Sequence, residues 1–137
     1  MGNAWTDWNR RLRLPVIAAP MTGVSGPDLV IEACVNGVIG SFPTQNTPTL
    51  HDVDEWLQRI DAGIAARAGE LAIEPAPYAV NLVMRRDGAR LAAEVDALVR
   101  HGVELVITSV GSPAPVLADL HQAGVTVLAD VATLHHA

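Results

Sequence analysis

Residues 78–109, YAVNLVMRRDGARLAAEVDALVRHGVELVITS, contain one complete strand–helix–strand unit. The run 78–83, which is apolar except for Asn81, predicts a strand buried on both faces, because short apolar runs are typical of parallel sheets. Asp87-Gly88 predicts a helix start, apolar residues then recur at helical spacing, and His101-Gly102 predicts the helix end. A second apolar run follows over 103–108. Two strands joined in this way are parallel, with a right-handed crossover.

The same unit recurs on both sides of this segment. Further short apolar runs predict strands over 16–19, 38–42 and 125–128, which gives five strands in all. Helices are expected over 3–12, over 27–36, after the capping residue Thr49, from Ser112-Pro113 to Gly124, and from Ala132 or Thr133 onward. Repeated units of this kind indicate an α/β protein. Two architectures remain open: a doubly wound sheet, and a (β/α)8 barrel, which needs about 250 residues.

Composition limits the function classes. The chain has 137 residues, 50% of them apolar, and a net charge of −6. These values predict a soluble globular protein with one hydrophobic core, and the negative charge argues against nucleic acid as the main partner. No apolar run is long enough to span a bilayer, and the first residues lack the apolar region of a signal peptide, so we expect a cytoplasmic protein. All nine basic residues are Arg, which excludes a lysine nucleophile on this chain.

Small and polar residues gather where the predicted strands end. Parallel α/β folds bind ligands at the carboxyl ends of their strands. The segment Ala18–Gly23 follows the first strand, Asn81 lies near the end of the third, and Asp130 follows the fifth. Each also has a structural interpretation: Met21 as a core residue, Asn81 bonding a neighbouring loop, and Asp130 capping a helix at Thr133. A Gly-rich dinucleotide or P-loop pattern is absent, so nothing supports the doubly wound alternative.

Other reactive residue types predict no site. The five His residues show no metal-ligand spacing, and no nucleophile–His–acid arrangement is evident. The single cysteine, Cys34, lies among Ala and Val on a predicted helix face, which predicts a buried, inert thiol and no internal disulfide. We therefore expect neither a metal site nor a covalent nucleophile.

Five segments in order resemble the nitronate monooxygenase family, formerly called 2-nitropropane dioxygenases. The opening Leu14–Ser25, LPVIAAPMTGVS, carries the strongest resemblance, and four further segments follow it in the expected order: 36–41 (NGVIGS), 78–82 (YAVNL), 108–113 (TSVGSP) and 124–133 (GVTVLADVAT). Together they cover nearly the whole chain. Flavin-dependent enoyl-acyl-carrier-protein reductases closely resemble the nitronate monooxygenase family. The motifs therefore indicate the superfamily that contains both groups of enzymes more specifically than they indicate one reaction.

The resemblance implies a TIM barrel that binds FMN at its carboxyl-terminal face and oxidises alkyl nitronates with O2 to a carbonyl compound and nitrite. Ala19, Pro20, Met21 and Thr22 would lie against the isoalloxazine ring, largely through backbone atoms, and Asn81 would hydrogen-bond the flavin ring or the chain that leads to its phosphate. Asp130 stands where many members carry a Lys that contacts FMN. The family's catalytic His lies in a Gly-Gly-His segment beyond the fifth strand, so no residue of this chain is assigned that role.

We therefore expect residues 1–137 to form the first five strand–helix units of a (β/α)8 barrel, as the N-terminal part of one FMN-binding domain. The expected partners are a nitronate and O2, together with a second copy of the chain or a complementing C-terminal half, because an open sheet exposes an edge strand. The alternatives are an enoyl-acyl-carrier-protein reductase-like enzyme and a truncated, non-catalytic half barrel.

Overall fold

Four parallel strands form one sheet in the described chain. The structure is a computed structural model that describes residues 4–136, with side chains described for 7–135. The strands lie side by side in chain order, and each neighbouring pair is parallel. They are β1 (Gly40–Pro43), β2 (Tyr78–Val83), β3 (Leu105–Ser109) and β4 (Thr126–Ala129). The α/β class predicted from the sequence is thereby confirmed.

The order of the strands separates the two architectures that the sequence left open. A doubly wound sheet reverses its winding at a switch point, so its strand order departs from the chain order. The order β1-β2-β3-β4 has no such reversal. A barrel adds each strand beside the one before it, which produces this order. The sheet is therefore of the barrel type.

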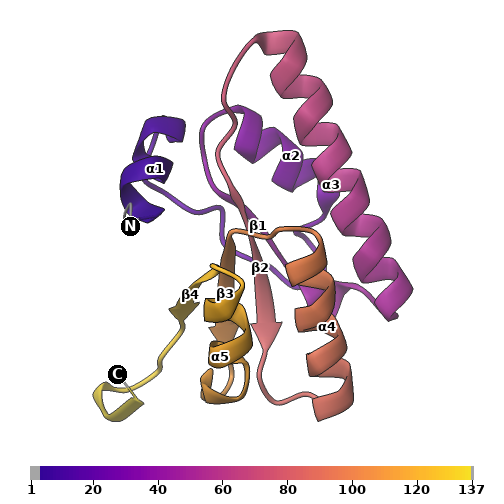
Figure 1. Ribbon diagram of the computed structural model, residues 1–137, viewed down its shortest axis with the longest axis vertical. Helices are drawn as coiled ribbons and strands as arrows, with labels where there is room; N and C mark the ends of the chain where they lie inside the picture. The colour runs from indigo at the N-terminus through magenta and orange to yellow at the C-terminus, as the bar shows by residue number, and fades with distance from the viewer. Residues whose placement is uncertain (1–3, 137) are drawn as a thin grey trace.

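Four helices cover one face of the sheet (Figure 1). They are α2 (Pro27–Val35), α3 (Leu50–Leu71), α4 (Gly88–Arg100) and α5 (Ala114–Gln122). Because successive strand residues point to opposite faces, alternate side chains enter this layer. Phe42, Val80, Leu82 and Val106 pack there against buried side chains of the helices. This layer is the main core of the protein.

The helix α1 (Ala4–Arg11) lies on the opposite side of the sheet (Figure 1). Its Trp8 is 2% exposed and packs against Ile39, Ala79 and Leu105. The Trp8 indole donates to Glu104 Oε2 over 3.1 Å, and Arg11 pairs with the same carboxylate at 2.8 Å. Because Glu104 directly precedes β3, α1 covers the sheet face opposite the four helices at the amino-terminal ends of the strands.

Local capping signals place two of the helix starts. Thr49 accepts a hydrogen bond from the Asp52 backbone, and Asp52 accepts one from the Thr49 backbone, so the cap predicted at Thr49 is present and forms a capping box before α3. The Asp52 carboxylate accepts hydrogen bonds from the Thr49 hydroxyl and from the Thr49 backbone N–H, and these two bonds lower the pKa of Asp52. Asp87 caps α4 by accepting from the Arg90 backbone. The start of α2 differs, because its N-cap is Gly26 and no side chain caps it.

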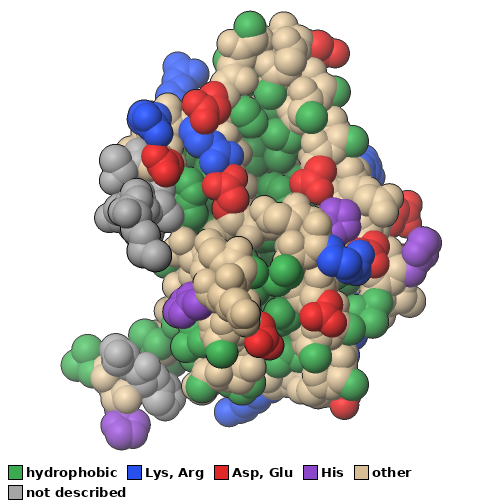
Figure 2. Space-filling view, viewed as in Figure 1, with side chains coloured by type: hydrophobic (Ala, Val, Ile, Leu, Met, Phe, Trp, Pro, Cys, Tyr) green, Lys and Arg blue, Asp and Glu red, His purple; other side chains and the backbone are tan. Residues whose placement is uncertain are grey.

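Two expected elements are shorter than the sequence predicted. The strand expected over 16–19 is present only as a single parallel bridge between Ile17 and Ile39. Pro15 and Pro20 flank this segment and lack the N–H groups that would extend its ladder. The helix expected from Ala132 or Thr133 is a short 3-10 turn, η2 (Leu134–His136), on a segment that projects from the body (Figures 1 and 2). No helix in the described part of the chain is both long and apolar enough to cross a membrane.

Gly40 lets α2 approach β1 closely, which makes its replacement informative. A Cβ at Gly40 would lie 2.6 Å from the Val30 carbonyl oxygen and 2.8 Å from Val30 Cα. We expect Gly40→Ala to lower the free energy of unfolding by about 2 kcal/mol, because backbone atoms must move apart. Gly69→Ala is the matched control: a Cβ there meets nothing within 4 Å. It should raise the free energy of unfolding by about 0.5–1 kcal/mol. Urea unfolding measures both, and equal effects would contradict the close-approach argument.

Candidate functional site

The candidate residues all lie at the carboxyl-terminal edge of the sheet. Asn81 is on the central strand β2, where it is in register with Pro43 of β1 and Ile107 of β3. Residues 19–22 follow the bridge formed by Ile17. Asp130 follows β4, and its backbone N–H donates to the Thr108 carbonyl over 2.8 Å. The fold therefore brings these three groups to one edge, although no hydrogen bond among the described residues joins them to each other.

The turn formed by residues 19–25 is held from inside by Ser25. The Ser25 hydroxyl accepts a hydrogen bond from the Met21 backbone over 2.9 Å and donates to the Ala19 carbonyl over 3.3 Å. Ser25 is 1% exposed, whereas Met21 is 41% exposed. Ser25 directly precedes Gly26, the N-cap of α2, but its side chain stabilises the preceding turn and does not cap the helix. The buried Ser25 side chain thus stabilises a turn whose residues 21–24 are exposed to solvent.

Asn46 holds the same turn from the neighbouring loop. Its amide nitrogen donates to the carbonyls of Met21, over 3.1 Å, and Ser25, over 2.8 Å, and its amide oxygen accepts from the Gly23 backbone over 2.8 Å. Asn46 belongs to the 3-10 turn η1 (Thr44–Asn46), directly after β1. The sequence alone does not indicate a role for Asn46, because these partners lie more than 20 positions away along the chain. The available signal was an amide side chain directly after a strand.

Asn81 has the structural role that was one of the two interpretations left open by the sequence. Its amide nitrogen donates to the Ile107 carbonyl over 2.9 Å and to the Ser109 hydroxyl over 3.0 Å, so it ties β2 to β3. Asn81 is 6% exposed. Its side-chain oxygen accepts no hydrogen bond from any described residue, and an amide oxygen can accept up to two. The orientation of Asn81 is therefore fixed, while one acceptor stays available at the edge.

A buried carboxylate, which sequence reasoning missed, supports the loops behind this edge. Glu94 on α4 is fully buried and accepts from Arg86 over 2.6 Å, from Arg90 over 2.7 Å and from the Thr44 hydroxyl over 2.9 Å. Arg90 also donates to the Thr47 carbonyl over 3.2 Å. The four-residue spacing of Arg90 and Glu94 was visible in the sequence but is typical of a surface pair. Only packing shows that Glu94 lies beneath the η1 loop.

Asp130 and His101 lie at opposite edges of the sheet. Asp130 is exposed, and its side chain forms neither the helix cap considered from the sequence nor an ion pair with a described residue. His101 lies near the other edge of the sheet, where its ring nitrogens are 3.3 Å from Asp54 and 3.1 Å from Asp61. Among the described residues, no group of three or more His, Cys, Asp or Glu side chains is arranged to hold a metal ion.

The Cys34 thiol is buried in the main core, as the sequence predicts. It is fully buried, and burial raises its pKa to about 11. We expect negligible alkylation by iodoacetamide at pH 8 in the native chain and complete alkylation in urea, because the thiolate is the reacting form. Since the folded pKa exceeds that of an exposed thiol, the contribution of Cys34 to stability should fall as the pH rises from about 9 to 11. Rapid labelling of the native chain, followed by mass spectrometry, would contradict this.

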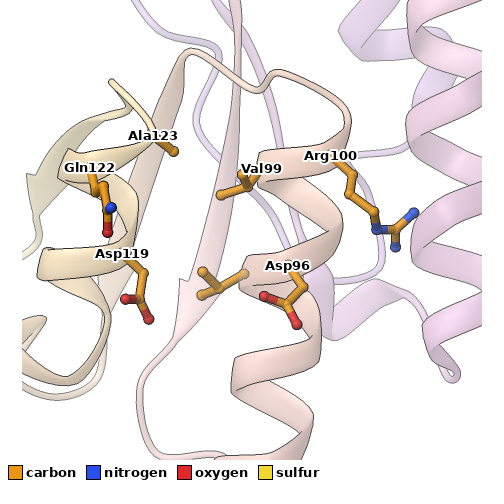
Figure 3. A pocket seen from close by; sticks show the side chains of 7 residues that line it. Asp96, Val99, Arg100, Asp119, Gln122 and Ala123 are labelled. Atoms are coloured by element: carbon orange, nitrogen blue, oxygen red, sulfur yellow. The ribbon is translucent and has the colours of Figure 1, made fainter.

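Two cavities in the described part of the chain lie away from the candidate edge. A groove of about 530 Å³ lies between α4 and α5 and is lined by Val95 and Val99, with Asp96 on the α4 side and Asp119 on the α5 side (Figure 3). A second cavity, of about 290 Å³, lies near the amino-terminal edge beside Tyr78 and His101. Neither is lined by a residue predicted for the site. The candidate site is thus separate from both of these cavities.

Comparisons with known proteins support the fold. No protein-family model matches the sequence, and no curated protein matches it. Among solved structures, FabK from Thermotoga maritima is similar, with a TM-score of 0.73 and 17% identity over 97% of this chain and 38% of that one. Its M276A mutant matches with the same score and identity over 40% of its length. This chain therefore spans about two-fifths of the structures it matches. Its fold is that of part of a TIM barrel.

Proposed function

We propose that this chain forms the part of an FMN site that contacts the flavin ring, in a flavin-dependent oxidoreductase. The observation that carries the proposal is a hydrogen-bonded turn, residues 19–25, which lies at the same carboxyl-terminal edge of a barrel-type sheet as the fixed amide of Asn81. Thr22 offers a backbone N–H with no partner among the described residues, and Asn81 offers a free side-chain oxygen. The edge of a flavin ring carries both acceptors and a donor, so the two groups are complementary to it.

The residues present fit the ring portion of FMN. Exposed Met21 and half-buried Pro20 provide an apolar surface beside the Thr22 amide, which suits a flat heterocycle. When bound, FMN would supply two-electron redox chemistry at this edge. Asp130, exposed after β4, is a carboxylate where the resembled family commonly has a cation. A carboxylate near the ring would disfavour negative charge on it.

We propose alkyl nitronates and O2 as the substrates, as the sequence resemblance implies. The matching FabK structures favour a second candidate, because FabK is an FMN-dependent enoyl-acyl-carrier-protein reductase of the same superfamily. The two reactions differ in co-substrate: the first consumes O2 and releases nitrite, and the second oxidises a reduced nicotinamide. A second copy of the chain, or a complementing C-terminal half beside β4, is the proposed protein partner.

Titration of the purified chain with FMN tests the proposal. We expect saturable binding, seen as quenching of flavin fluorescence, and about a 2–10-fold weaker affinity for Asn81→Leu, the effect of losing one hydrogen bond. Nitrite release with propyl-2-nitronate, set against nicotinamide oxidation with an enoyl thioester, then separates the two reactions. Absence of any FMN binding by the chain would overturn the flavin proposal.

A further inference from the structure

The turn over residues 21–25 has almost no free backbone donors. The Met21 N–H donates to Ser25 Oγ, the Gly23 N–H to Asn46 Oδ1, and the N–H groups of Val24 and Ser25 both donate to the Met21 carbonyl. The Thr22 N–H is the remaining one, and it makes no hydrogen bond within the described chain. The hydrogen bonds around Thr22 therefore fix the direction in which its N–H points.

Asn46 makes the largest side-chain contribution to this arrangement. It uses its amide nitrogen on two carbonyls and its amide oxygen on one N–H, on both sides of Thr22. No other side chain has the length and groups to replace it: Asp has no donor, and Ala has neither donor nor acceptor. Asn46 thus determines the shape of the turn from a different loop.

The loop that carries Asn46 is itself anchored in the protein interior. Thr44, in the same 3-10 turn, is fully buried and donates to Glu94 Oε2 over 2.9 Å. Thr47 donates from its hydroxyl to the Thr44 carbonyl over 2.5 Å, and its own carbonyl accepts from Arg90. Asn46 therefore projects from a rigid segment, and groups held in this way bind with a smaller loss of entropy.

From these contacts we infer that Asn46 is a positioning residue for the ligand of this edge. It holds the turn so that the Thr22 N–H faces a hydrogen-bond acceptor on a planar heterocycle. The inference rests on the proposed function, in which that heterocycle is the flavin ring. Asn46 itself need not touch the ligand, because it acts through the Met21, Gly23 and Ser25 backbone.

The test compares Asn46→Asp with Gln45→Glu. Both substitutions replace an amide by a carboxylate in the 3-10 turn η1. Gln45, however, is exposed, and its side chain makes no hydrogen bond with a described residue. We expect Asn46→Asp to weaken FMN binding about tenfold or more, because two donors are lost and the carboxylate faces two carbonyls. Gln45→Glu should stay within about twofold of the unmodified chain. Asn46→Ala removes the same hydrogen bonds without placing a carboxylate beside the two carbonyls, and it replaces Asn46→Asp in the test if that variant does not fold.

A second readout separates positioning from general stability. At saturating FMN, the midpoint potential of the bound flavin should shift in Asn46→Asp and Asn46→Ala and remain unchanged in Gln45→Glu. Hydrogen exchange of the Gly23 amide should also accelerate in both Asn46 variants. If the unmodified chain binds FMN and the Asn46 variants match Gln45→Glu in affinity and potential, the inference is wrong and the proposed function stands. If the unmodified chain binds no FMN, the proposed function fails and takes the inference with it.

Discussion

Glu94→Gln is expected to lower the free energy of unfolding by about 3 kcal/mol, because it removes the charge from a buried, paired carboxylate. The carboxylate is fully buried and has three donors, from Arg86, Arg90 and Thr44. The two guanidinium groups are about one-fifth exposed, so they would lose their counter-charge in a largely desolvated place. Urea unfolding followed by circular dichroism measures the change.

Glu32→Gln is the matched control for that experiment. Glu32 pairs with Arg67 on the surface, where their side chains are 53% and 42% exposed. Solvent weakens such pairs, so the control should change the free energy of unfolding by less than about 1 kcal/mol. A Glu94 variant no less stable than the Glu32 variant would show that the buried network does not support the fold.

Phe42→Ala is the second substitution with a large expected effect. Phe42 on β1 is fully buried in the main core, and its ring lies 5.4 Å from that of Trp56 on α3. Removing the ring should lower the free energy of unfolding by about 3–5 kcal/mol, because apolar contacts are lost and a cavity is left. Thermal and urea unfolding both report this change.

Phe42→Leu separates the volume of the ring from its aromatic character. Leucine fills most of the space but loses the aromatic pair with Trp56, which is worth about 0.5–1.5 kcal/mol. We therefore expect a loss of about 1–2 kcal/mol for Phe42→Leu. If the alanine and leucine variants were equally unstable, packing volume at this position would not be the main cause.

The candidate site was predictable only where the signal was local. The residues at strand ends, such as Asn81 and the segment around Met21, could be identified because a strand end is visible as the end of an apolar run. Asn46 and Glu94 could not be identified, because their partners come from other loops and helices. Contacts of that kind depend on how far apart the elements pack, which a single sequence does not express.

The first strand shows the same limit within the fold. Its apolar run predicts a strand over 16–19, yet only Ile17 forms a bridge, because strand pairing depends on the neighbouring N–H groups and on the partner strand. By itself, the sequence determined the alternation of strands and helices, their parallel direction and the edge at which polar residues gather, since these follow from local periodicity and short connections. The tertiary structure alone decided that the strands follow one another in chain order. It also decided that Asn46 fixes the turn before α2 and that Glu94 is buried, because strand order, distant hydrogen bonds and burial arise only when the elements pack together.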